Sequence, residues 1–132
     1  MGFAQKAIRT VYPDLAVRMI RVYSDMETKF GHPMKASSGL RSFREQEEIY
    51  AKGRTLPGPI VTAAKPGDSL HNYGCAIDSI FIGTDPFPKD DILWNNFGRL
   101  AMAHGLNWGG QWRTLHDKPH TQITYGLDLS QI

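Results

Sequence analysis

The chain has a single cysteine, no long hydrophobic run and no cluster of basic residues. Cys75 cannot form a disulfide within the chain, so the fold does not depend on oxidation. No apolar stretch approaches the roughly 20 residues that a membrane-spanning helix needs. The 15 Lys and Arg residues are scattered and are nearly balanced by 13 Asp and Glu. Because nucleic-acid-binding proteins gather their basic residues on one face or in one run, this scatter argues against that class.

The first residues also lack a recognisable targeting signal. Residues 1–6 show no charged region followed by an apolar segment of about 7–15 residues and a small-residue cleavage site. Lys6 stands where a myristoylation signal needs Ser or Thr. We therefore expect a chain made in the cytoplasm without a signal peptide. If its substrate lies outside the cytoplasm, another component must give it passage.

The composition is that of a globular protein. Hydrophobic residues make up 41% and charged residues 21% of the 132 positions. A chain of this length can bury roughly two thirds of its unfolded surface around one core. We expect a single domain over 1–132, without a separate binding domain and without a membrane span, that acts as a monomer.

The periodicity of the apolar residues predicts the helices. Residues 5–30 are predicted to be helical, with an interruption at Tyr12 and a new start at Pro13. Further helices are predicted over 42–52, where Ser42 and Glu45 have the spacing of a capping box, and over 92–104. The first helix should face the core through a stripe made of Leu15, Met19, Val22, Tyr23, Met26 and Phe30.

Short apolar segments between these helices predict strands. They lie at 34–39, 74–82, 106–108 and 121–124, and 60–64 should be a brief strand or an extended segment. The pattern indicates an α+β fold, a small antiparallel sheet packed with helices in a single domain.

Two stretches carry the residues with chemical potential. The first, 69–78, contains His71 and Asp78, and the second contains Asp117 three positions before His120. Two imidazoles and one carboxylate are a workable ligand set for zinc, and three protein ligands leave the fourth tetrahedral position to water. The remaining carboxylate could carry the proton of that water. The residues alone therefore predict a small zinc hydrolase.

Strand alternation separates Asp78 from its neighbours. Cys75, Ile77 and Ser79 should face away from the side on which Asp78 lies, so Cys75 is interpreted as a core thiol rather than a ligand. A carboxylate unpaired within an apolar strand is costly, and metal coordination would remove that cost. Taken singly, His71 could instead be a loop histidine bonded to backbone, and Asp78 a carboxylate satisfied by a turn.

These motifs resemble the M15 family of peptidoglycan peptidases. The resemblance rests on S-x-H-x-x-G-x-A-x-D at 69–78, on Trp-Gly-Gly at 108–110 and on D-x-x-H at 117–120, and it extends over about 37–124. The family contains D-alanyl-D-alanine carboxypeptidases and dipeptidases, and L-alanyl-D-glutamate endopeptidases of phage lysis enzymes. Members often carry a bulky apolar residue where this chain has Ser79, which by alternation faces away from the metal.

The resemblance implies a role for each residue of the site. It implies that His71, Asp78 and His120 bind Zn²⁺. Asp117 would be the catalytic acid or base, with a turn aspartate as the alternative. Arg41 would bind a substrate carboxylate or steady the oxyanion, with a surface arginine as the alternative.

The same resemblance implies a substrate and a place of action. Stem peptides of peptidoglycan would be cut in the cell wall or periplasm, with substrate contacts from Ser69, Tyr73 and Trp112, although such aromatic residues are as often part of a core. The motifs look most like the L-alanyl-D-glutamate endopeptidases and imply an endolysin of the phage type. A D-alanyl-D-alanine carboxypeptidase and a non-catalytic wall-binding or virion module remain alternatives.

Overall fold

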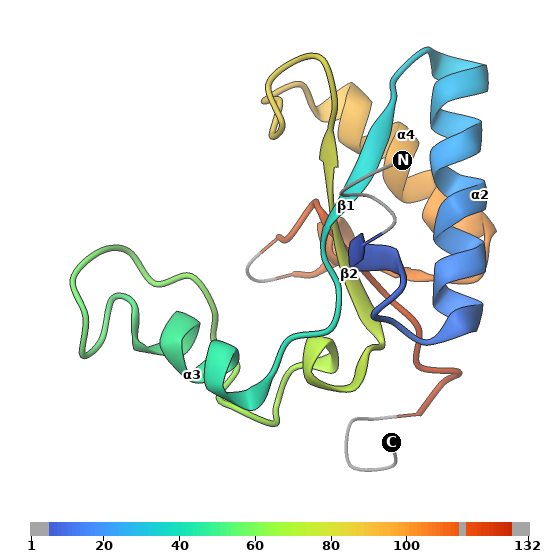
Figure 1. The fold of residues 1–132 in the computed structure, drawn as a ribbon. Helices are drawn as coiled ribbons and strands as arrows, with labels where there is room; N and C mark the ends of the chain where they lie inside the picture. The colour runs from blue at the N-terminus through green and yellow to red at the C-terminus, as the bar shows by residue number, and fades with distance from the viewer. Residues whose placement is uncertain (1–5, 114–115, 128–132) are drawn as a thin grey trace.

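The chain folds around a four-stranded antiparallel sheet with the strand order β1-β2-β4-β3 (Figure 1). The computed structural model describes residues 6–113 and 116–127. The elements in chain order are α2 (Pro13–Phe30), β1 (Met34–Ser38), α3 (Phe43–Ala51), η1 (Leu70–Tyr73), β2 (Ala76–Phe81), α4 (Asp91–Ala103), β3 (Asn107–Trp108), η2 (Gly109–Gln111) and β4 (His120–Gln122). The predicted α+β class is confirmed.

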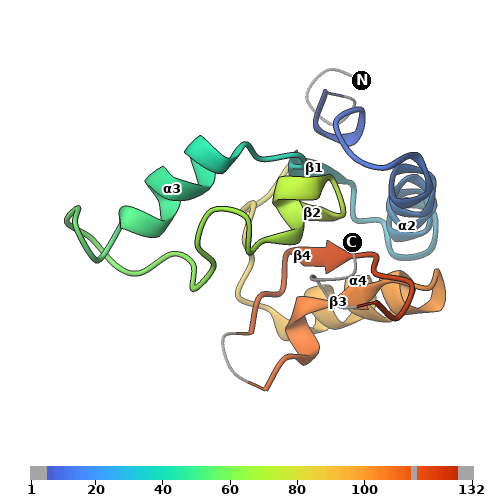
Figure 2. The same cartoon turned by 90° about the horizontal axis from the view of Figure 1, so that it is seen from below.

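Helices α2 and α4 cover one face of the sheet, as Figures 1 and 2 show together. The apolar core lies between these two helices and the strands. Helix α2 contributes Leu15, Met19, Val22 and Met26, all fully buried. Phe30, the last residue of the predicted stripe, is 42% exposed instead. The helix ends there, and Gly31 adopts a left-handed conformation with φ 71° that turns the chain away.

The rear of β2 contains a buried polar pair. Ile77 and Ser79 are both fully buried, as alternation along the strand predicts. The hydroxyl oxygens of Ser79 and Tyr23 lie 2.7 Å apart, within hydrogen-bond distance. The Ser79 hydroxyl, on the core side of β2, is thus paired with the Tyr23 hydroxyl of α2.

Residues 43–64, called the arm below, project from this body (Figure 1, turquoise to green). The arm consists of α3 and the connection after it. The predicted capping box is present, because Ser42 Oγ accepts from the Glu45 backbone N–H and the Glu45 carboxylate accepts from the Ser42 backbone N–H. Residues 60–64 form no strand. Exposed apolar side chains of the arm include Phe43, Leu56, Ile60 and Val61.

None of the helices in the described part of the chain is both long and apolar enough to cross a membrane. The expectation about the first residues falls largely on 1–5, which lie outside the described residues, and the single domain over 1–132 stays a prediction.

Candidate metal centre and active site

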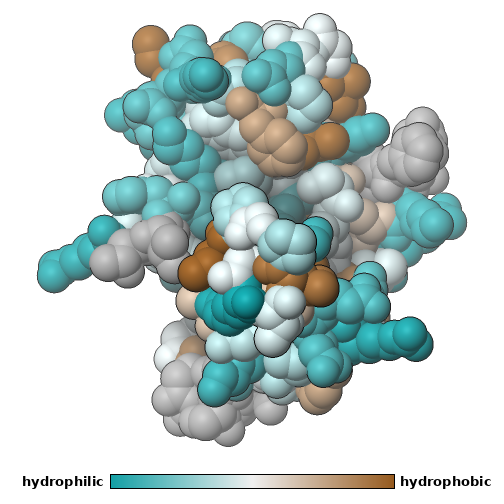
Figure 3. Space-filling model, turned by 90° about the vertical axis from the view of Figure 1, so that its left-hand side faces the viewer, coloured by the Kyte–Doolittle hydropathy of each residue, from teal (hydrophilic) through white to brown (hydrophobic). Residues whose placement is uncertain are grey.

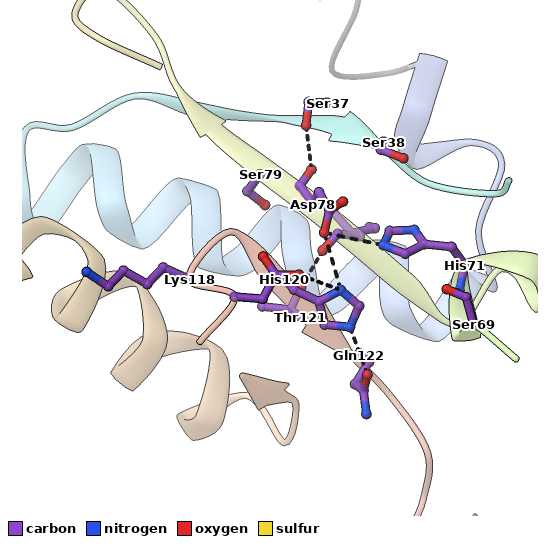
Figure 4. A network of polar contacts seen from close by, with 12 residues as sticks. Ser37, Ser38, Ser69, His71, Asp78, Ser79, Lys118, His120, Thr121 and Gln122 are labelled. Atoms are coloured by element: carbon purple, nitrogen blue, oxygen red, sulfur yellow. Dashed lines mark hydrogen bonds and ion pairs between the residues drawn. The ribbon is translucent and has the colours of Figure 1, made fainter. Parts of the chain in front are cut away.

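Three side chains from two separate stretches of the sequence converge beside the sheet (Figure 4). His71 lies on η1, Asp78 on β2 and His120 on β4, and one ligand atom of each falls within 4.8 Å of the others. Asp78 Oδ1 is 3.3 Å from His71 Nε2 and also 3.3 Å from His120 Nδ1. Because Asp78 and His120 are direct partners in the β2–β4 register, the sheet itself holds these two together.

The local sequence explains the orientation of His71. Ser69 Oγ accepts a hydrogen bond from the His71 backbone N–H and caps the short η1 turn. Gly74 ends this turn in a left-handed conformation, which glycine adopts without a steric cost. The ring Nδ1 lies 2.8 Å from the Gly39 carbonyl oxygen. Since a carbonyl can only accept, Nδ1 carries the proton and Nε2 offers its lone pair toward Asp78.

His120 is oriented through the opposite ring nitrogen. Its Nε2 lies 2.8 Å from Gln122 Oε1, and its Nδ1 faces Asp78. Gln122 was not among the predicted site residues. Its position two residues after His120 on the same strand, and so on the same face, was the signal that could have found it.

Asp78 carries the observation that argues most directly for a cation. Its Oδ1 is buried and has no hydrogen-bond partner. Burial raises the pKa of this carboxyl group, but the facing rings of His120 and His71 lower it more, so the net pKa lies below its ordinary value. Two imidazole nitrogens beside a buried carboxylate oxygen without a hydrogen-bond partner form a donor set that fits a divalent metal ion with one position left open. Among the described residues, this group can hold a metal.

Asp117 lies next to the three ligands. Its Oδ2 is 3.9 Å from His120 Nδ1. Burial, and then the charge of Asp78, raise the pKa of the Asp117 carboxyl group above its ordinary value. A carboxyl group with a raised pKa is suited to accept and return a proton near neutral pH. The structure thus places the predicted acid or base within reach of the metal position.

The Trp-Gly-Gly segment is the support of the Asp117 turn. The Gly109 carbonyl accepts from the Asp117 backbone N–H, and a Cβ at position 109 would lie 2.3 Å from the Asp117 carbonyl oxygen. Trp108 Nε1 donates to the Lys118 carbonyl over 2.8 Å. Trp108 is buried in the core, packed so closely on Gly98 that a Cβ there would lie 2.2 Å from the indole. Trp108 thus links the turn at 117–118 to the apolar core.

Arg41, which lies just before the arm in the sequence, reaches the same centre. Its Nη2 is 3.7 Å from Asp78 Oδ2, and its Nη1 donates to Gln46 Oε1 over 2.9 Å. The side chain is 15% exposed, so it is not a freely solvated surface arginine.

A cleft of about 810 Å³ contains the three ligands together with Arg41 and Asp117. Ser69 and Trp112 line it as well, and the Trp112 ring lies 5.0 Å from the His120 ring. The arm provides one wall through Ile49 and 61–64. Figure 3 views the molecule from the side on which the arm projects, where brown apolar and teal polar side chains lie together.

Tyr73 is not among the residues that line this cleft. Its hydroxyl donates to the Gly67 carbonyl, and its ring packs edge-on against Phe43. Of the eight predicted site residues, His71, Asp78, His120, Asp117, Arg41, Ser69 and Trp112 are brought together, and Tyr73 lies apart.

Neither of the other candidates near the motifs belongs to the ligand group among the described residues. His116 Nδ1 lies 3.1 Å from the Gly110 carbonyl on the rim of the cleft. Cys75 is buried, as its interpretation as a core thiol requires, and burial raises the pKa of its thiol.

Known proteins share both the sequence and the fold. Residues 62–123 match a profile of the M15 peptidases described as D-alanyl-D-alanine carboxypeptidase. The chain is 39% identical over 101 residues to the peptidoglycan L-alanyl-D-glutamate endopeptidase CwlK of Bacillus subtilis (strain 168), which covers 66% of this chain. It spans 58% of the length of that relative.

Two solved structures extend the likeness to most of the chain. The L-Ala D-Glu endopeptidase ChiX of Serratia marcescens is 28% identical, with a TM-score of 0.64 over 94% of this chain and 88% of its own. The vancomycin-resistance D,D-pentapeptidase VanY, solved with Zn(II), is 16% identical, with a TM-score of 0.65 over 92% of this chain and 82% of its own. At that identity the likeness to VanY concerns the fold.

Proposed function

We propose that the chain is a peptidase of the M15 family and, within it, a zinc-dependent hydrolase of peptidoglycan stem peptides. The observation that carries the proposal is the convergence of His71, Asp78 and His120, one ligand atom of each lying within 4.8 Å of the others, while Asp78 Oδ1 is buried without a hydrogen-bond partner. We propose zinc because two nitrogens and one carboxylate oxygen with an open position form the usual donor set of catalytic zinc sites.

The proposed mechanism assigns one task to each neighbouring side chain. When bound, the metal ion would supply Lewis acidity toward water and toward the carbonyl oxygen of the scissile bond. Asp117 would take the proton of the attacking water and return it to the nitrogen of the leaving amine. Arg41 would donate hydrogen bonds to a substrate carboxylate or to the negative charge that develops on the carbonyl oxygen.

The bond that we propose is the one between L-alanine and D-glutamate. CwlK and ChiX are described as L-alanyl-D-glutamate endopeptidases, and they are the relatives with 39% and 28% identity. The cleft also supports an internal cut, since it is lined by 61–64 of the arm and, beyond the ligands, by Thr124 and Leu127. A D-alanyl-D-alanine carboxypeptidase is the second candidate, favoured by the description of the matching family profile.

Digestion of purified peptidoglycan, with and without a chelator, tests the proposal. Mass spectrometry of the products should reveal new N-terminal D-glutamate. Released D-alanine would support the carboxypeptidase instead. A digest without any chelator-sensitive product would contradict zinc-dependent hydrolysis and support a binding module.

Asp117→Asn separates catalysis from metal binding. Loss of a general acid or base should lower kcat by roughly 10²–10⁴-fold. Zinc affinity should change little, because Asp117 is outside the three-ligand group. Asp90→Asn makes the same chemical change at the N-cap of α4 and should leave both quantities unchanged, since asparagine caps a helix as well as aspartate does.

We further propose that the enzyme acts on the cell wall from the periplasmic side, as a monomeric lysis enzyme of the phage type. The support is the resemblance of its motifs to that branch of the family. Addition of the protein to permeabilised Gram-negative cells should clear the suspension, and light scattering should give the mass of one chain. Cells that stay turbid while purified peptidoglycan is cut would contradict the lytic role alone.

A further inference from the structure

Helix α3 is attached to the body in an unusual way. Its one buried side chain is that of Gln46, which is 0% exposed. A helix normally packs through an apolar stripe. Burial of an amide without hydrogen bonds is costly, so a glutamine at this position requires partners for both ends of its side chain.

Both ends of the Gln46 amide have partners, one just before the arm in the sequence and one at its last residue. Oε1 accepts a hydrogen bond from Arg41 Nη1 over 2.9 Å, and Nε2 donates to the Ala64 carbonyl over 2.8 Å. Arg41 precedes α3, whereas Ala64 ends the arm and lines the cleft. One side chain thus joins the two ends of the arm at its base.

Of the side-chain contacts described for the Arg41 guanidinium, the hydrogen bond to Gln46 is the shortest, at 2.9 Å. The other groups near it are Ser38 Oγ, 3.4 Å from Nη2, and Asp78 Oδ2, 3.7 Å from Nη2. The main chain of Arg41 is fixed separately by its N–H, which donates to the His71 carbonyl. Loss of the Gln46 oxygen would therefore free the side chain while leaving the backbone in place.

We propose that Gln46 is a positioning residue of the cleft, which aims the Arg41 guanidinium toward Asp78 and holds the wall at 61–64 beside it. The inference rests on the proposed function, in which Arg41 contacts the substrate. A glutamine suits both tasks because one end accepts from a cation and the other donates to a carbonyl. Glutamate can perform only the first, and methionine neither.

Two variants of Gln46 and one control test the proposal. Gln46→Met keeps the length of the side chain without its hydrogen bonds, and Gln46→Glu keeps the acceptor for Arg41. Glu47→Met introduces methionine at the adjacent, exposed position of the same helix and should behave as the wild type.

The first measurement needs no substrate. Trypsin should cut after Lys52 and Arg54 about fivefold faster in both Gln46 variants. Each variant has lost the hydrogen bond to the Ala64 carbonyl, so the arm should detach locally from the body more often. Zinc affinity should stay within about twofold of the wild type, since the ligands are untouched. An unchanged cleavage rate would contradict the attachment of the wall through Gln46.

The second measurement is kcat/KM on peptidoglycan fragments. Gln46→Met should lose about tenfold, as expected for a guanidinium left without its partner, and Gln46→Glu should lose less. When Arg41 is already replaced by alanine, adding Gln46→Met should lower kcat/KM by less than about twofold further. A residue that acts through Arg41 has no effect to exert once the guanidinium is gone. Equal losses in both backgrounds would overturn the inference while leaving the enzyme assignment intact.

The outcomes remain distinguishable if the chain or a variant fails. Should the wild type cut no peptidoglycan, the proposed function fails, and the trypsin comparison alone decides whether Gln46 holds the wall. Should Gln46→Met fail to fold, Gln46→Glu decides. For Gln46→Glu, faster cleavage by trypsin together with a largely retained kcat/KM on peptidoglycan supports the proposal. Wild-type behaviour of this variant in both assays overturns it.

Discussion

The body and the arm are stabilised by different interactions. The body buries apolar side chains between α2, α4 and the sheet, among them Leu15, Ile77 and Phe97 at 0% exposure. The arm exposes Phe43, Leu56, Ile60 and Val61, and α3 fully buries only one side chain, that of Gln46. The proposed metal ligands Asp78 and His120 are paired on strands of the body, whereas the cleft wall at 61–64 belongs to the arm and Arg41 is hydrogen-bonded to it through Gln46. The proposed metal centre is thus built mainly on strands, and the proposed substrate wall on a segment with fewer buried contacts.

The largest effect is expected from a substitution in the proposed metal centre of the body. Asp78→Asn removes the charged ligand between the two imidazoles, so zinc should no longer bind tightly and hydrolysis should fall to the level of the chelator-treated wild type. In thermal unfolding, zinc at about 100 times its dissociation constant should stabilise the wild type by roughly 2.7 kcal/mol. The variant should show no such shift. A variant that keeps the shift would remove Asp78 from the ligand set.

The second effect concerns the core of the body. Phe97→Ala leaves a cavity beneath the sheet and should lower the free energy of unfolding by about 3–5 kcal/mol in chemical denaturation. The three ligands are not touched, so the folded fraction should still bind zinc. A loss below about 1 kcal/mol would show that the body is less tightly packed than the burial of this side chain implies.

A smaller effect tests the support of one ligand. Gln122→Leu removes the acceptor for His120 Nε2, and zinc affinity should fall by about 10–100-fold in competition with a chelator. Gln122→Glu keeps an acceptor and should retain most of the affinity. Gln111→Leu, at an exposed position of η2, is the matched control. Equal affinity in the leucine variant and the wild type would show that His120 needs no such support.

The smallest effect is expected in the arm. Leu56 is 49% exposed, so Leu56→Ala should change the free energy of unfolding by less than about 0.5 kcal/mol. This variant and Phe97→Ala, measured side by side, quantify the contrast between the two regions. A comparable loss in both would mean that the arm folds as an integral part of the core.

Much of the body could be predicted from the sequence, because its signals are local and periodic. Alternation along β2 separated Asp78 from Ser79, the spacing of Ser42 and Glu45 gave the cap of α3, and the motifs gave the ligands that the structure brings together. Phe30 was misjudged because the periodicity extends to the last residue of the helix, while burial ends one turn earlier.

The supporting residues could not be predicted in the same way. Gln46 lies in a polar run of a mostly exposed helix, and its role depends on Ala64, 18 positions away. The sequence alone allowed Trp108 to line either the cleft or the core. Its close packing against Gly98 shows that it belongs to the core. Such roles follow from tertiary contacts rather than from spacing along the chain.

The hydrogen bond between Ser79 and Tyr23 also helps to fix the pairing register of β2, the strand that contains Asp78. If β2 slid by one residue against its neighbours, every side chain would change faces. The Asp78 carboxylate would enter the apolar interior, and the Ser79 hydroxyl would lose its phenol partner on α2. Adjacent polar residues with unlike partners on the two faces therefore make the shifted pairing doubly unfavourable, and this strand has one acceptable alignment rather than several.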